Sequence, residues 1–245
     1  MVQHALKVSL AALSQTGQRD CNEDAFGYWE GAGSLIAVLC DGSGGHGGGQ
    51  VASRTAVTHV LEAFASHPEI SFDALRTLVQ GANDAVVALQ VAGTSTADMR
   101  TTIVVLLLDL HSGAALWAHA GDSRLYRWRD AQLVARTHDQ SLEQRLRDAG
   151  LSTASVEGQL TSALGSPEGF DLDMLDSPQI LGEGDALLLC SDGLWSAFDD
   201  TVMASSVVGC SGVQEWLDRL VAGVQRADRS DQDNYSALAL WCAPD

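Results

Sequence analysis

Residues 35–49 have the sequence LIAVLCDGSGGHGGG, in which a run of six apolar residues ends at Asp41-Gly42 and a glycine-rich segment follows. An apolar run of this length, bounded by turn residues, is typical of a buried strand. Asp-Gly alone is typical of a turn. The same arrangement returns at residues 186–193, ALLLCSDG, where Asp192 follows a second apolar run. We therefore expect two buried strands whose terminal aspartates converge on one site.

The other elements are expected around these two strands. Three more apolar runs of strand length lie at residues 103–108, 114–118 and 237–241. Helical spacing of apolar residues indicates two consecutive helices at 51–64 and 75–86, and two later ones at 141–149 and 213–226. Adjacent helices and a hairpin-like pair at 103–118 favour an α+β fold over a doubly wound sheet. We expect one domain over residues 1–245, with a flap insertion at about 150–178.

Composition excludes some classes of function. Asp and Glu number 32 against 14 Lys and Arg, a formal charge of −18, which disfavours binding to nucleic acid or anionic lipid. The five cysteines show no CxxC spacing, so neither a disulfide framework nor a thiolate zinc site is indicated. The apolar runs are too short to span a bilayer. We expect a soluble, cytoplasmic protein with no membrane contact.

Two further acidic segments add to the strand-end aspartates. Asp231-Gln-Asp233-Asn234 stands before the last apolar run, and Asn22-Glu23-Asp24 lies near the start. Clustered carboxylates repel one another unless hard cations lie between them, and Mg²⁺ and Mn²⁺ prefer such oxygen ligands. The combination predicts a divalent-metal site.

At this point the sequence resembles the PPM-type metal-dependent protein phosphatases in their compact bacterial form. Seven segments follow one another in the order of that family's motifs: RDCNED at 19–24, DGSGGH at 41–46, GDSR at 121–124, HDQS at 138–141, LTSALG at 160–165, SDG at 191–193 and DN at 233–234. The resemblance implies a four-layer α/β/β/α sandwich of two mainly antiparallel sheets flanked by helices. It also implies hydrolysis of phosphoserine and phosphothreonine in proteins by a water that two metal ions activate.

The resemblance implies a role for each matching residue. Two Mn²⁺ or Mg²⁺ ions per subunit are expected, and a third, weaker ion at Asp122 and Asp192. By the same resemblance, Asp41 bridges the two ions, Asp192 and Asp233 bind one of them, and the Gly42 carbonyl binds the other. Glu23 and Asp24 would act mainly through metal-bound water. Arg19 would bind the phosphate. Phosphoprotein substrates and a cognate Ser/Thr kinase are the implied partners.

Two assignments stay open at the level of the sequence. Ser43 stands where many eukaryotic members have a histidine that protonates the leaving group, so the general acid is unassigned. His46 could replace it, or it could be a plain loop residue. Asp122 could hold the third ion, or it could belong to a turn, since Gly-Asp-Ser-Arg is a common turn composition.

Two rival functions fit the sequence less well than a phosphatase. Residues 42–47 fit the dinucleotide fingerprint GxGxxG, but Glu62 falls inside a helical pattern and Asp41 would repel a pyrophosphate. A pseudophosphatase that binds without turnover would be expected to lack ligands such as Asp192 or Asp233. Trp195 is interpreted as a core-packing residue.

Overall fold

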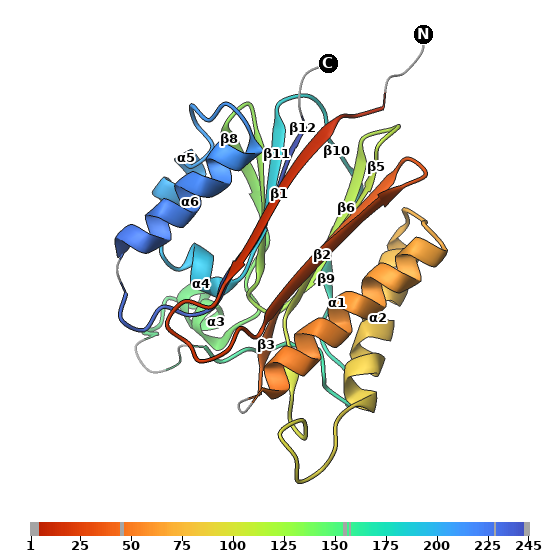
Figure 1. The fold of residues 1–245 in the computed structure, drawn as a ribbon, viewed down its shortest axis with the longest axis vertical. Helices are drawn as coiled ribbons and strands as arrows, with labels where there is room; N and C mark the ends of the chain where they lie inside the picture. Colours follow the sequence, from red (N-terminus) through yellow and green to blue (C-terminus); the bar gives the residue numbers. More distant parts are fainter. Residues whose placement is uncertain (1–4, 45–46, 154–155, 157, 228, 243–245) are drawn as a thin grey trace.

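The computed structural model describes residues 5–44, 47–153, 156, 158–227 and 229–242, and it has two antiparallel sheets face to face (Figure 1). The first sheet contains, in spatial order, β1 (Val8–Gln15), β12 (Tyr235–Cys242), β11 (Asp185–Cys190), β7 (Arg124–Arg129) and β8 (Gln132–Arg136). The second contains β10 (Gln179–Ile180), β6 (Ala114–Ala120), β5 (Ile103–Asp109), β3 (Ser34–Ser43) and β2 (Asp24–Gly31), with β4 (Arg100–Thr101) beside β3 and β9 (Asp173–Met174) beside β6.

Helices cover the outer faces of both sheets. α1 (Gly48–Ser66) and α2 (Phe72–Ala88) lie on the second sheet, and α6 (Val213–Ala227) lies on the first (Figure 1). Three short helices complete the set: α3 (Leu142–Asp148), α4 (Asp192–Trp195) and α5 (Asp200–Ser205). The predicted α/β/β/α sandwich is confirmed.

Alternation along the strands explains the continuous apolar runs. In β3, Leu35, Ala37 and Leu39 belong to the core between the sheets. The residues between them, such as Ile36 and Val38, belong to the core beneath α1 and α2. β11 divides in the same way between the central core and the core beneath α6. Successive side chains point to opposite faces, so a strand covered on both faces must be apolar throughout.

Seven strands of the described residues were not predicted, namely β1, β2, β4, β7, β8, β9 and β10. β4, β9 and β10 have only two residues each. β1 and β2 are edge strands with partly exposed, mixed side chains, so neither has the long apolar run of a core strand. β7 has the sequence RLYRWR, yet Arg124 and Arg127 are buried because they pair with Asp139 and Asp185. These pairings are invisible to a search for apolar patterns.

The described part of residues 150–178 returns to the body of the fold at several points. Leu160 forms a bridge with Ser141, Leu164 forms one with Thr101, and β9 pairs with β6. This segment therefore passes beside β4, close to the end of β3.

The helices bear on the rival dinucleotide-binding function and on membrane crossing. Glu62 lies inside α1, so the dinucleotide fingerprint has no acidic residue at the end of a second strand. Within the described ranges, no helix combines the length and apolarity needed to cross a bilayer.

Candidate metal centre

A cavity of about 480 Å³ opens where β3, α4, the start of β12 and the loop at residues 16–23 meet. It brings together most of the residues predicted for the site: Arg19, Glu23, Asp41, Gly42, Asp122, Asp192 and Asp233. Asp24 is buried behind them, where its Oδ2 accepts a hydrogen bond from Ser191 Oγ at 2.8 Å. His46 lies outside the described residues. Side chains from both ends of the chain thus converge on one cavity.

Asp41 lies inside a strand rather than after one. β3 continues to Ser43 because β4 pairs with Gly42 and Ser43. Thr102 fixes the backbone of Asp41 from both sides: its Oγ1 accepts from Asp41 N at 2.9 Å, and its own N donates to Asp41 O at 2.8 Å. Thr102 was not predicted as a site residue, and a lone threonine gives no sequence signal for this role.

Two glycines allow backbone segments to approach the site closely. A Cβ on Gly42 would lie 2.1 Å from Gly49 O, and one on Gly193 would lie 2.1 Å from Asn234 O. Neither distance can accommodate a side chain, so glycine is required at both positions. The first contact presses the end of β3 against the start of α1, and the second presses α4 against β12.

Asn234 connects the loop at residues 16–23 to β12. Its Nδ2 donates to Thr16 O at 2.7 Å and to Cys21 O at 2.9 Å, and its Oδ1 accepts from Glu23 N at 2.8 Å. All three amide hydrogen bonds cross more than 200 residues of sequence. Asn234 is therefore a positioning residue for Glu23, a role that the sequence pattern did not reveal.

Arg19 is held at the cavity by an ion pair. Its terminal nitrogen donates to Asp233 Oδ2 at 2.7 Å, and both side chains are substantially exposed to solvent. An exposed ion pair of this kind contributes little to stability. The guanidinium is thus available to an anion that enters the cavity.

The aspartates of the site carry raised pKa values. Burial, followed in order by repulsion from Asp24, Asp192 and Asp122, raises the pKa of Asp41 well above its usual range. Burial also raises the pKa of Asp24 to about 6 and that of Asp122 to about 7, with repulsion from Asp192 adding to both. The pKa of Asp192 is raised by burial and then by Asp233. Two buried and two partly buried carboxylates that repel one another call for additional positive charge.

The donor set fits hard divalent cations. Glu23 Oε1 and Asp24 Oδ1 are buried and have no hydrogen-bond partner among the described residues. Among the described residues, no group of three or more acidic, histidine or cysteine side chains is placed to hold one metal ion by itself. Ions of the Mg²⁺ type keep several waters and take only one or two carboxylates each. Asp41, Asp192 and Asp233 with the Gly42 carbonyl therefore suit a pair of water-rich ions.

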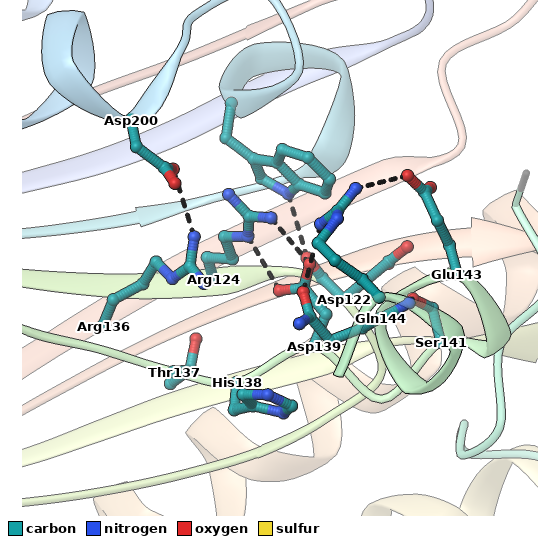
Figure 2. Close-up of polar contacts among 12 residues, drawn as sticks. Asp122, Arg124, Arg136, Thr137, His138, Asp139, Ser141, Glu143, Gln144 and Asp200 are labelled. Atoms are coloured by element: carbon teal, nitrogen blue, oxygen red, sulfur yellow. Dashed lines mark hydrogen bonds and ion pairs between the residues drawn. The ribbon is translucent and has the colours of Figure 1, made fainter. Parts of the chain in front are cut away.

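Asp122 stands in the short connection between β6 and β7, beside a buried polar group (Figure 2). Arg124 donates to both carboxylate oxygens of Asp139, at 2.7 and 2.6 Å, and its guanidinium lies 3.4 Å from the centre of the Trp195 ring. Trp195 Nε1 in turn donates to Asp122 O at 2.9 Å. Trp195 packs against the core as predicted, and it also joins Asp122 to α4, which carries Asp192.

The metal-free protein is expected to lose stability as pH rises from 5 to 7.5. In the folded state Asp24 and Asp122 keep their protons up to about pH 6 and 7, whereas in the unfolded chain they ionise near 4. The folded state therefore binds more protons in this range, and the free energy of unfolding falls with rising pH. Each pKa unit corresponds to about 1.4 kcal/mol, so the melting temperature should drop by several degrees.

Thermal melts in chelator at pH 5 and pH 7.5 measure this effect. Added Mn²⁺ should restore the lost stability at pH 7.5. A metal-free protein that melts at a higher temperature at pH 7.5 than at pH 5 would contradict the electrostatic description of the site.

Comparison with known proteins places the chain among a set of relatives. The family model described as Protein phosphatase 2C matches residues 14–232. Protein phosphatase PhpP of Streptococcus pneumoniae is 31% identical, over 95% of this chain and 98% of the relative. Serine/threonine protein phosphatase PstP of Mycobacterium tuberculosis is 30% identical over 84% of this chain, which spans only 40% of that relative's length.

A solved structure bears on the metal site. The catalytic domain of serine threonine protein phosphatase PstP, in complex with two manganese ions, superposes with a TM-score of 0.80. It is 29% identical in sequence, and the match covers 97% of this chain and 99% of that one.

Proposed function

This chain belongs to the Protein phosphatase 2C family, and on that premise we propose that it hydrolyses phosphoserine and phosphothreonine in proteins. The observation that carries the proposal is the cavity in which Asp41, Asp192 and Asp233 lie beside Arg19. Carboxylates for metal ions and a guanidinium for a phosphate are the groups that hydrolysis of a phosphomonoester requires.

We propose that two Mn²⁺ or Mg²⁺ ions bind at Asp41, with Asp192 and Asp233 on one ion and the Gly42 carbonyl on the other. When bound, such ions would lower the pKa of a water and neutralise the charge that develops on the phosphoryl group. The two manganese ions in the PstP structure support this number. A third ion at Asp122 and Asp192 is supported by the position of both residues on one cavity, where the Asp192 carboxylate repels that of Asp122.

The chain's own groups then have defined tasks. Arg19 offers a planar fork for two phosphate oxygens. Glu23 Oε1 and Asp24 Oδ1, which lack partners among the described residues, would accept hydrogen bonds from ordered water. Ser43 lines the cavity, but the general acid stays unassigned, because His46 lies outside the described residues.

The proposal predicts strict metal dependence. Purified protein treated with chelator should release no phosphate from a phosphothreonine peptide, and Mn²⁺ or Mg²⁺ should restore release, because the carboxylates alone repel the substrate. Release measured with a phosphate assay is the test, with Asp192→Ala as the variant that should not recover. Absence of turnover in folded, metal-loaded wild type would instead favour a binding role.

We further propose a cytoplasmic enzyme that opposes a Ser/Thr kinase acting on the same substrates. All five cysteines are free, which fits a reducing compartment. The kinase is inferred only from the reaction, because a phosphatase needs an enzyme that supplies its phosphorylated substrate.

A further inference from the structure

A second cavity, of about 340 Å³, adjoins the metal centre. The two cavities share Ser43, Gly158 and Leu160 along their common border. We call the second one the Arg100 pocket, defined by Ser43, Arg100, Leu160, Thr161, Ser166 and Phe170. A substrate bound at the metal centre would therefore extend directly into it.

The position of Arg100 follows from strand pairing. In the short ladder between β3 and β4, Arg100 is directly opposite Ser43. Opposite residues of an antiparallel pair share a face, and so do residues two apart in one strand. Arg100 thus stands on the same face as Asp41. Arg100 is opposite Ser43, which is two residues from Asp41 along β3. An extended peptide advances about 3.3–3.6 Å per residue, so the separation between Arg100 and Asp41 corresponds to about two residues of substrate.

The charge of the Arg100 pocket is opposite to that of the metal centre. None of its described lining residues is acidic, whereas the metal centre is lined by several carboxylates. The Arg100 side chain is exposed and makes no hydrogen bond or ion pair with the described residues, unlike the side chains of Arg124 and Arg127. In a chain of charge −18, an unpaired cation at this place is available for an anion from outside.

The other groups of the pocket suit the same ligand. Hydroxyl groups of Ser43, Thr161 and Ser166 are donors that carboxylates and phosphates accept from. The Thr161 hydroxyl is buried and has no hydrogen-bond partner among the described residues. An unsatisfied buried hydroxyl is a cost that a bound anion's oxygen would offset.

We propose that the Arg100 pocket binds an anionic group close to the phosphorylated residue of the substrate, either an acidic side chain or a second phosphate. This rests on the proposed function, and it specifies the substrate class: phosphoproteins with negative charge within about two residues of the scissile phosphate. Arg100 then acts as a specificity-determining residue.

Two sets of three phosphothreonine peptides test the proposal. Within a set, the peptides differ only at one position, which is Ala, Asp or phosphoserine. This position lies two residues before the phosphothreonine in one set and two residues after it in the other. In wild type with Mn²⁺, kcat/KM should be about three- to tenfold higher for the Asp or phosphoserine peptide than for the Ala peptide, mainly through KM. If the Asp peptide has the higher kcat/KM, the pocket binds an acidic side chain, and if the phosphoserine peptide has it, the pocket binds a second phosphate.

Variants assign the preference to Arg100. Arg100→Ala should bring the ratio close to one, and Arg100→Glu should invert it. The matched control is Arg76→Ala, which removes the same charge from an exposed position on α2. It should keep the wild-type ratio. A wild-type ratio near one, or a ratio that Arg100→Ala leaves unchanged, overturns the proposal.

A binding measurement keeps this test separate from that of the proposed function. Fluorescence anisotropy of the same labelled peptides requires no turnover, and the dissociation constant should show the same order in wild type and lose it in Arg100→Ala. If no peptide is hydrolysed, the proposed function fails while anisotropy still decides about the pocket. Hydrolysis without any preference in either assay rejects the pocket alone.

Discussion

Asp41→Asn is expected to reduce metal-dependent phosphate release by about 10³-fold or more. Asp41 is the proposed bridge between two ions, and Asn offers one neutral oxygen in place of a carboxylate. The same change should make the metal-free protein more stable at pH 7.5, because it removes one of four buried or partly buried carboxylates that repel one another. Opposite effects on activity and apo stability are the signature of a charge that serves metal binding.

Phosphate release and chelator-treated thermal melts of the same preparations measure both effects. Asp218→Asn is the matched control, since Asp218 stands on α6, away from the cavity. Asp218→Asn should leave both the rate of phosphate release and the melting temperature of the metal-free protein close to the wild-type values. If Asp41→Asn kept activity within tenfold of wild type, the assignment of Asp41 as a bridging ligand would be wrong.

Asp185→Asn is expected to destabilise the fold by about 3–5 kcal/mol. Asp185 is fully buried and accepts from Arg129 at 2.7 Å, from Gly182 N at 2.7 Å and from Arg127 at 3.4 Å. Burial alone would raise its pKa, but these donors hold it below the usual value. Without the carboxylate, the buried Arg127 loses its counter-charge, and such a charge is costly in an apolar environment.

Asp200→Asn provides the control for this prediction. Asp200 also pairs with an arginine of the first sheet, Arg136 at 3.2 Å, but its side chain is 82% exposed. Its loss should cost less than about 1 kcal/mol. Urea unfolding at pH 7 compares the two variants, and equal losses would contradict the view that burial sets the energetic value of the pair.

The strands that form the core could be predicted from sequence, because burial on both faces requires uninterrupted apolar runs such as 35–40. β7 could not, since two of its three arginines, Arg124 and Arg127, are buried only through partners elsewhere in the chain. Asp139 is 15 residues from Arg124, and Asp185 is 58 residues from Arg127. The edge strands β1 and β2 are recognisable only once their neighbours are known.

The residues of the metal centre also divide into those that could be predicted from sequence and those that could not. The acidic residues carry a chemical signal, because carboxylates at strand ends demand an explanation, and the family resemblance supplies one. The residues that position these carboxylates carry no such chemical signal. Thr102 holds Asp41 across 61 residues, Trp195 contacts Asp122 across 73, and Ser191 donates to Asp24 across 167. Each is an ordinary residue whose role arises only from the folded chain.

The pairing of β1 with β12 has a consequence for biosynthesis. β12 is the sole sheet neighbour of β1 within the described ranges, and the paired residues Ser14 and Ser236 are 222 positions apart, so β1 cannot pair until β12 has been translated. The Asn234 hydrogen bond that positions Glu23 likewise cannot form until residue 234 has been translated. Contacts of such long range make folding slow. A nascent or prematurely terminated chain that lacks β12 should thus release no phosphate.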